Sequence, residues 1–265
     1  MDAIVRAARQ AEDLGFADVW VSDHVAVPRV REYPPSAYIH EPLVTMAVAA
    51  TATTSVGIGT SVLVVPMRQP VLLAKQLASI DVLSGGRVIL GAAAGWLEAE
   101  FRALGTNFDS RGEILDESID LMRAVWTEDP IYHDAPVSGV ELKDMRTKPQ
   151  PAASIPIWIG GHSPPVYRRA IEQGDGWHGA FKPPSETKPI VELLRRGRPE
   201  PDFVLSMRTG WDALEDDHDR ILSELEEFHH IGIQHIVAEP RQRTIDDWLR
   251  GGEALAELYE LASFD

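Results

Sequence analysis

The sequence predicts a parallel α/β fold in which short buried strands alternate with helices. Most of the seven expected strands are short apolar runs, such as Val88-Ile89-Leu90 and Ile157-Trp158-Ile159, that lack the polar alternation of a half-exposed strand. Segments with helical spacing separate these runs along the whole chain, and no internal repeat interrupts them. Strands of this kind pair in parallel through right-handed crossovers, so the pattern is consistent with a TIM-type barrel and with a doubly wound open sheet.

The elements follow in order from a first helix at residues 4–14, which Gly15 ends as a C-cap glycine would. The seven strands are expected at 17–22, 56–65, 87–94, 155–159, 176–180, 203–207 and 235–238. Further helices are expected at 43–52, 70–83 and 245–261.

One long insertion, at about 98–154, separates the third and fourth strands. An S-x-x-E motif begins at Ser110 and predicts a capping box, and an apolar stripe from Leu115 to Trp126 marks the helix that follows. Residues 134–153 are expected to form an irregular excursion. We expect a single domain over residues 1–265 that includes this insertion.

Composition and charge narrow the possible partners. The 265 residues include 25 basic and 41 acidic side chains, which gives a formal net charge of −16, and 44% of residues are hydrophobic. This acidic balance disfavours nucleic acid and anionic membranes, so a small molecule is the expected partner. The absence of cysteine excludes thiolate metal sites, and no other metal-ligand spacing is found, so no metal is expected.

The amino-terminal residues do not have the pattern of a signal peptide, because acidic residues interrupt any apolar core, and a cytoplasmic location is expected. Residues 42–67 carry no charge and could imitate a membrane span. Thr, Ser and Gly residues interrupt this stretch, so we interpret it as a buried helix followed by a buried strand.

Reacting groups in parallel α/β proteins gather after the carboxyl ends of strands. The residues at these positions are Asp23 and His24, Ser61 to Pro66, Gly95 and Trp96, and Gly160 to Ser163. An imidazole at a strand end can exchange protons near neutral pH, although a lone histidine is also common as a structural residue. Trp96 could stack on a flat ring or pack in the core.

The loop Gly160-Gly161-His162-Ser163-Pro164 has two glycines that allow close approach of a ligand, and a proline that begins the next helix. A phosphate fits such a loop, and an ordinary turn between a strand and a helix is the alternative. The sequence contains no G-x-S-x-G, G-x-G-x-x-G or P-loop motif, which disfavours a serine hydrolase, a Rossmann enzyme and a P-loop enzyme.

At these positions the chain resembles the luciferase-like monooxygenase superfamily, and within it the F420-dependent oxidoreductases. The resemblance runs from about Ala7 to about Ala180. It rests on these segments: Ala11 to Phe16, Val21 to His24, Gly59 to Leu63 with Pro66 and Arg68, Leu73 to Ala78, Asp81 to Arg87, Gly95-Trp96 with Glu100-Phe101, Arg111-Gly112 with Glu117, Pro156 to Gly161, and Gly174 to Trp177.

The resemblance implies a TIM-type (β/α)8 barrel of the bacterial luciferase-like kind, here lacking its first strand, and a homodimer. It implies that Asp23, His24 and Trp96 lie at the reactive edge of the cofactor ring, and that Ser61-Val62, often a cis peptide, and Gly95 support this ring. The residues implied to hold the phosphate are Gly160, Gly161, His162 and Ser163, with Gly176 near the same tail.

The expected reaction is hydride transfer between coenzyme F420 and a small organic substrate, with His24 exchanging the accompanying proton. An FMN-dependent two-component monooxygenase of the luciferase or alkanesulfonate type is one alternative, and a cofactor-binding barrel without turnover is another. Related sugar-phosphate dehydrogenases carry a glutamate where this chain has Trp96, which puts activity on glucose 6-phosphate in doubt. Glu98 is expected to be solvated. Structural roles are expected for Glu100, Arg111 and Glu117. Arg168 and Arg169 are candidates to hold the anionic cofactor, and a solvated helix face is the favoured alternative for them.

Overall fold

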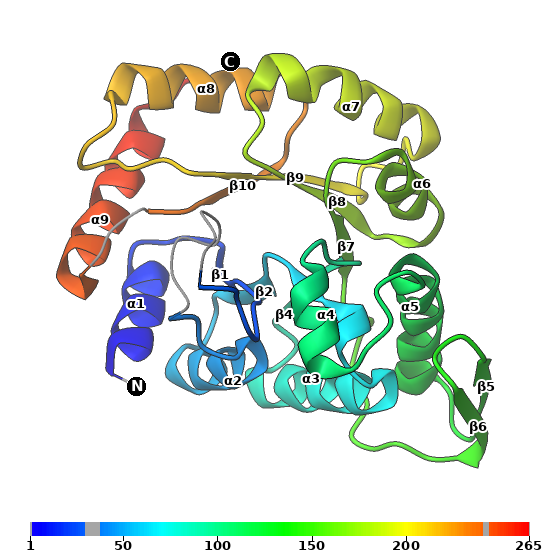
Figure 1. The fold of residues 1–265 in the computed structure, drawn as a ribbon. Helices are drawn as coiled ribbons and strands as arrows, with labels where there is room; N and C mark the ends of the chain where they lie inside the picture. The colour runs from blue at the N-terminus through cyan, green and yellow to red at the C-terminus, as the bar shows by residue number, and fades with distance from the viewer. Residues whose placement is uncertain (1, 30–37, 241–243, 265) are drawn as a thin grey trace. The chain divides into compact units, whose positions relative to one another are not determined.

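The computed structural model describes residues 2–29, 38–240 and 244–264 (Figure 1). The contacts within the chain divide it into two compact units. Unit 1 comprises residues 1–19 and 157–265, and unit 2 comprises residues 20–156. The single domain expected from the sequence stays a prediction.

The strands of unit 2 form parallel pairs. β2 (Gly57–Thr60) pairs with β4 (Val88–Ala93), and β3 (Leu63–Val64) pairs with β4 farther along the chain. β1 (Asp18–Val21) neighbours β2. The predicted strand at 56–65 is thus divided in two, so the described residues contain eight strands of parallel sheet where seven were expected. α1 (Asp2–Asp13) is the first described element.

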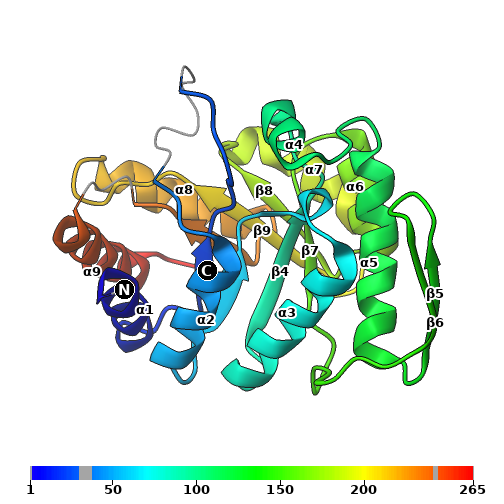
Figure 2. The same ribbon diagram turned by 60° about the horizontal axis from the view of Figure 1, so that its bottom comes forward.

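Helices α2 (Pro42–Ala52), α3 (Pro70–Ser84) and α5 (Arg111–Thr127) pack in series, and η1 (Val65–Met67) lies between β3 and α3 (Figure 2). The charge-free stretch at 42–67 therefore forms a helix followed by strands, as expected. Among the described residues, no helix has the length and apolarity needed to span a bilayer.

The insertion differs from the prediction in two details. α5 begins after Ser110, but the Ser110 side chain makes no capping hydrogen bond, because its backbone, at φ −88° and ψ 8°, is not in the extended conformation usual for an N-cap residue. The expected irregular excursion contains an antiparallel hairpin, β5 (Ile131–Ala135) and β6 (Val140–Met145), which packs beside α5.

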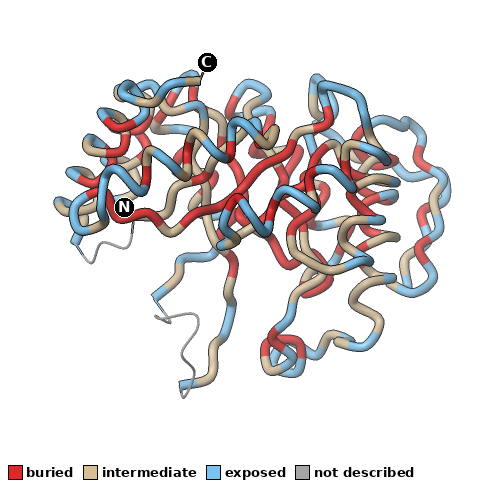
Figure 3. The backbone as a smooth tube through the Cα atoms, turned by 90° about the horizontal axis from the view of Figure 1, so that it is seen from above, coloured by how far each residue is buried: buried red, intermediate tan, exposed pale blue. Residues whose placement is uncertain are grey.

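Unit 1 contains four parallel strands and their helices. The strands are β7 (Ile157–Gly160), β8 (Gly176–Ala180), β9 (Val204–Thr209) and β10 (His235–Ala238), and each pairs with the next. The helices are α6 (Pro164–Gln173), α7 (Pro184–Gly197), α8 (His218–His230) and α9 (Ile245–Leu261). Buried residues run through the strands (Figure 3).

The two ends of the chain meet in unit 1, where α9 packs against α1. The Arg6 side chain donates to Asp246 at 2.7 Å, and Gln10 donates to Glu253 at 2.9 Å. Gly15 follows α1 with φ +79°, in agreement with its prediction as a C-cap residue.

Candidate functional site

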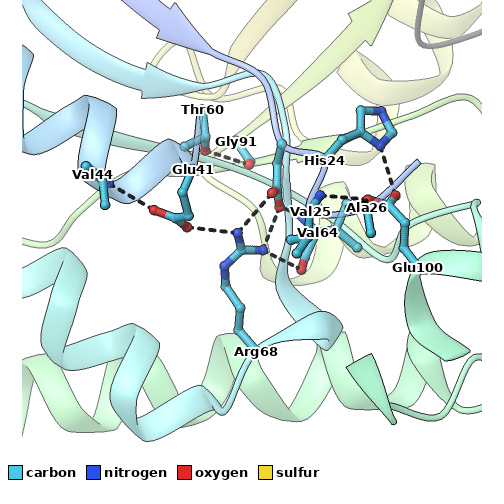
Figure 4. Close-up of polar contacts among 11 residues, drawn as sticks. His24, Val25, Ala26, Glu41, Val44, Thr60, Val64, Arg68, Gly91 and Glu100 are labelled. Carbon is cyan, nitrogen blue, oxygen red and sulfur yellow. Dashed lines mark hydrogen bonds and ion pairs between the residues drawn. The ribbon is translucent and has the colours of Figure 1, made fainter. Parts of the chain in front are cut away.

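His24 and Glu100 form a close pair in unit 2 (Figure 4). His24 follows β1, and Glu100 lies in the short helix α4 (Glu98–Leu104). The Nδ1 atom of His24 lies 2.9 Å from Oε2 of Glu100, and the side chain of Glu100 is only 2% exposed. The other oxygen, Oε1, accepts hydrogen bonds from the backbone N–H groups of Val25 and Ala26 at 2.7 and 3.1 Å.

This arrangement sets the proton positions on the His24 ring. An ionised carboxylate can only accept hydrogen bonds, so Nδ1 carries the proton and donates a hydrogen bond to Glu100. In the neutral ring, Nε2 is then the unprotonated nitrogen and can take a proton from a ligand. Glu100, which the sequence analysis assigned a structural role, therefore belongs to the site. Its position after the carboxyl end of β4 was the signal available in the sequence.

Trp96 stands beside His24. The two ring centroids lie 6.1 Å apart at an interplanar angle of 81°, and Trp96 is 49% exposed. The exposed indole is therefore not a core residue and can contact a ligand.

Gly95 forms the turn that directly precedes Trp96. It has φ +87°, and a Cβ atom there would lie 2.5 Å from Cγ1 of Val64. The Arg111 side chain donates to the carbonyl oxygen of Gly95 at 3.1 Å, so the structural role expected for Arg111 consists in fixing this turn.

Asp23 has a different environment from His24. Its carboxylate accepts two hydrogen bonds from the Arg68 guanidinium, at 2.6 and 2.9 Å, and one from the backbone N–H of Val64 at 2.8 Å. Burial lowers the pKa of Arg68, but Asp23 and Glu41 outweigh this effect and raise it. Because the Asp23 side chain is fully buried in this pair, we assign it to positioning the strand end that carries His24.

The Ser61–Val62 peptide bond is cis, as the resemblance implied. It lies where two strands approach closely, because a Cβ atom on Gly91 would come within 1.9 Å of the Thr60 carbonyl oxygen. The Thr60 hydroxyl donates to the Gly91 carbonyl at 2.8 Å (Figure 4). Ser61 and Val62 therefore continue from a rigid strand end.

In unit 1, the loop Gly160–Ser163 presents several hydrogen-bond donors. Gly161 has φ +123° and its N–H donates to the His178 carbonyl. Among the described residues, the backbone N–H groups of His162 and Ser163 have no hydrogen-bond partner, and the Ser163 hydroxyl makes no capping bond. This set of donors fits an anion.

The first turn of α6 adds less to this loop than the sequence suggested. Pro164 and Pro165 have no backbone N–H group. The backbone N–H groups of Val166 and Tyr167 donate to the carbonyl oxygen of Ser163. The donors for an anion therefore come from the loop and not from the helix.

The His162 ring leaves one nitrogen for a ligand. Its Nε2 atom lies 2.7 Å from the Ala180 carbonyl oxygen and 2.9 Å from the Ala180 N–H, whereas Nδ1 is buried without a partner among the described residues. Burial lowers the pKa of His162, and the charge of Lys182 lowers it further.

Among the described cations, Lys182 is the one whose charge acts on His162, and it pairs with Glu186 at 2.5 Å. Arg168 is largely exposed and pairs with Glu172 at 3.8 Å, whereas Arg169 is buried.

Gly176, which was expected near the tail of the cofactor, lies in a tightly packed part of the sheet. It begins β8, at the opposite end of this strand from Ala180, and a Cβ atom there would lie 2.6 Å from the Val204 carbonyl oxygen and 2.9 Å from the Trp158 ring. Glycine at this position is required by strand packing, and the expectation that it lies near the cofactor tail is not supported.

A row of polar side chains crosses the sheet of unit 1, and the sequence analysis did not find it. Nδ1 of His178 lies 2.9 Å from the Ser206 hydroxyl, which lies 3.2 Å from Nδ1 of His235. Nε2 of His235 contacts Asp18 at 2.8 Å. Burial, together with the charges of His235, Arg208 and His162, lowers the pKa of His178 to about 3.

The remaining sequence expectations concern residues around these groups. Glu98 is solvated and pairs with Arg102 at 2.8 Å. Glu117 accepts from the backbone N–H groups of Val137 and Ser138 at 3.0 and 2.9 Å, which is a structural role. The described residues contain no cluster of three or more histidine and carboxylate side chains that could bind a metal ion.

Comparisons with known proteins identify the family. The sequence model of the luciferase-like monooxygenase family matches residues 1–258. An F420-dependent glucose-6-phosphate dehydrogenase of Amycolatopsis mediterranei is 36% identical over 180 residues, which cover 66% of this chain and 52% of that protein. An uncharacterised protein of Mycobacterium tuberculosis is 29% identical over 205 residues, which cover 73% of this chain and 70% of that protein. The match spans about half the length of the Amycolatopsis dehydrogenase.

Solved structures show the same fold. An F420-dependent secondary alcohol dehydrogenase in complex with an F420-acetone adduct has a TM-score of 0.81 at 20% identity, over 96% of this chain and 92% of that one. The coenzyme F420-dependent tetrahydromethanopterin reductase of Methanopyrus kandleri has a TM-score of 0.77 at 17% identity, over 96% of this chain and 93% of that one. The fold class is thus the TIM-type barrel of these proteins and not the doubly wound sheet. The chain belongs to the luciferase-like monooxygenase family.

Proposed function

We propose that this protein is an oxidoreductase that binds coenzyme F420 and transfers a hydride between it and a small organic substrate. The observation that supports this most is the His24–Glu100 pair, which prepares one ring nitrogen for proton exchange beside the exposed Trp96. The F420-dependent relatives favour this cofactor over FMN.

Each unit by itself has residues that fit one part of this cofactor: those of unit 2 fit a flat ring, and those of unit 1 fit a phosphate. The donors of the loop Gly160–Ser163, with the unpartnered Nδ1 of His162, would hold the phosphate. Ser61, Val62 and Gly95 would support the ring. When bound, the cofactor supplies the carbon that gives or accepts the hydride. FMN shares the ring shape and the phosphate, so the experiment must separate the two cofactors.

His24 handles the proton that accompanies the hydride. In alcohol oxidation, Nε2 takes the hydroxyl proton of the substrate, and the carboxylate of Glu100 stabilises the imidazolium that results. In carbonyl reduction, the same nitrogen returns the proton. Trp96 limits the space next to the ring and contacts the substrate through its exposed face.

The first test is a titration of the purified protein with F420 and, separately, with FMN, followed by fluorescence of the cofactor ring. We expect saturable F420 binding and weaker FMN binding. Tight FMN binding without F420 binding would overturn the proposal in favour of the flavin monooxygenase. The expected homodimer can be checked on the same sample by light scattering.

The second test uses variants in an F420-reduction assay with a panel of small alcohols. His24→Ala should lower kcat by about 100-fold or more, which is the usual contribution of a general base. His230→Gln, at an exposed position on α8, is the matched control and should leave the rate unchanged. A His24→Ala protein with normal kcat would refute the assigned role.

A further inference from the structure

Unit 2 contains a groove of about 560 Å³ that lies outside the groups described above. One wall is the beginning of α3, and the other is β6 with the residues beside it. Small-molecule sites in proteins commonly have volumes of this size. The described residues that line the groove include neither His24 and its neighbours nor the loop Gly160–Ser163.

Lys75 brings a positive charge to this groove. Three of the five lysines of the chain pair with a carboxylate: Lys143, Lys148 and Lys182. For Lys75 and Lys188, the described residues provide no ion pair or hydrogen bond to the ammonium group. Lys188 is exposed, whereas Lys75 is partly buried. A charge that is partly removed from water without a partner is unfavourable, so an anion at Lys75 would be stabilising.

The polar side chains beside Lys75 leave this charge unpaired. Gln69 caps α3 through its side-chain oxygen, which accepts from the backbone N–H of Leu72 at 2.7 Å. Its amide nitrogen has no hydrogen-bond partner in the described part of the chain and stays available as a donor. Glu141 lines the groove too, but its carboxylate pairs with Lys143. The groove therefore offers a positive charge and an amide donor to an anionic group.

Apolar side chains lie next to these donors. Leu72 precedes Lys75 by three residues on α3, so the two side chains share one face of the helix. Leu72 is 56% exposed, and Val71, Val140 and Leu142 line the same groove. A ligand with a charged head and an apolar body would match both kinds of surface.

Thr147 adds an unsatisfied hydroxyl to the groove. Its Oγ1 atom is buried and has no hydrogen-bond partner among the described residues. Buried hydroxyls in folded proteins usually have a partner, because leaving one unpaired is costly. Rotation about the Cα–Cβ bond is the movement that would offer this hydroxyl to an anion in the groove.

We propose that the groove between α3 and β6 binds a small amphiphilic carboxylate. The carboxylate accepts hydrogen bonds from Lys75 and Gln69, and the alkyl chain packs on Leu72 and Leu142. This site goes beyond the proposed function and does not rest on it. The net charge of −16 repels anionic membranes, which favours a soluble carboxylate over a lipid surface. The contrary view is that Lys75 only lays its methylene groups along Leu72 and is solvated at its end.

The test is isothermal titration calorimetry of the full chain with octanoate, with octanol as the uncharged analogue and acetate as the anion without a chain. Octanoate should show saturable binding, and the other two should bind at least about tenfold more weakly. Lys75→Gln should weaken octanoate binding by about tenfold, which is the usual loss of one charge-assisted hydrogen bond. Leu72→Ser should weaken it by about fivefold through lost apolar contact.

Two matched controls accompany these variants. Lys188→Gln removes the other unpaired lysine, which is exposed on α7 in unit 1. Leu83→Ser removes another exposed leucine of α3, near the opposite end of this helix. Neither control should change octanoate binding. Lys75 and Leu72 are not fully buried, so their variants should fold, and the melting temperature checks this.

Three results would overturn the proposal. The first is equal binding of octanol and octanoate, and the second is unchanged octanoate binding in Lys75→Gln. The third is a change from dimer to monomer in Leu72→Ser, measured by light scattering, which would assign the groove to a contact between two copies of the chain. Vesicles of phosphatidylglycerol should not sediment with the protein, and sedimentation that Lys75→Gln abolishes would also refute the soluble ligand.

F420 titration of Lys75→Gln separates this inference from the proposed function. Affinity for F420 should equal that of the wild type. If the wild-type chain fails to bind F420 but follows the octanoate pattern, the proposed function fails and the carboxylate site stands. If F420 binds and the octanoate pattern is absent, the carboxylate site fails alone.

Discussion

His178 should make the stability of this protein fall steeply in mild acid. Its side chain is fully buried and contacts Ser206, and burial together with the positive charges of His235, Arg208 and His162 lowers its pKa from 6.5 to about 3. Between these two values the unfolded chain binds a proton at His178 that the folded chain does not. The free energy of unfolding therefore falls as the pH drops below 6.5, and the contribution of this residue is complete only above that pH.

The magnitude follows from the size of the shift. Each pH unit between the two pKa values costs about 1.4 kcal/mol, so acidification from pH 7 to pH 5 should remove about 2 kcal/mol through His178 alone. His178→Gln keeps a hydrogen-bonding group toward Ser206 but cannot titrate. The variant should therefore lose about 2 kcal/mol less than the wild type over the same interval.

The assay is urea unfolding at pH 7, 6 and 5, followed by tryptophan fluorescence. His230→Gln is the control, because His230 is exposed and its replacement should leave the pH dependence as in the wild type. An equal loss of stability in the wild type and in His178→Gln would refute the claim that His178 is held neutral.

The other predictions concern the residues around His24. Glu100→Gln should lower kcat by about 10-fold to 100-fold with little change in KM, because the ring of His24 loses its orienting carboxylate; steady-state kinetics with the best alcohol checks this, and an unchanged kcat would contradict it. Asp23→Asn should cost about 3 to 5 kcal/mol in the free energy of unfolding, because it removes the fully buried carboxylate that holds both Nη atoms of Arg68 and leaves this arginine only the half-exposed Glu41, whereas Arg102→Gln in an exposed pair should cost at most about 1 kcal/mol. Gly95→Ala should lower the melting temperature and abolish turnover, because its Cβ has no space, whereas Gly105→Ala, also at positive φ but in open space, should lower only the melting temperature.

The order of strands and helices could be predicted from the sequence because it depends on neighbouring residues. The apolar run Val88-Ile89-Leu90 became β4, and Gly15 ended α1 at positive φ. The hairpin β5–β6 was missed because its strands are short and polar. The capping box at Ser110 was wrong because the backbone there is not in the extended conformation that an N-cap residue usually adopts.

The candidate site was predicted only in part. Spacing placed His24, Trp96 and the loop Gly160–Ser163 at the ends of strands, and the structure agrees. Spacing does not show which side chains meet, so Glu100 was assigned to structure although its carboxylate contacts His24, 76 residues away.

The sequence by itself determined the alternation of strands and helices, the family and the positions at which chemistry can occur, because hydrophobic period, glycine placement and motif order are local properties of the chain. Only the tertiary structure decided the partners: Glu100 for His24, and Arg68 for Asp23. These pairs depend on how neighbouring strands align and on which helix follows each strand end. A charge acquires its chemical role only when the fold brings its partner within hydrogen-bond distance.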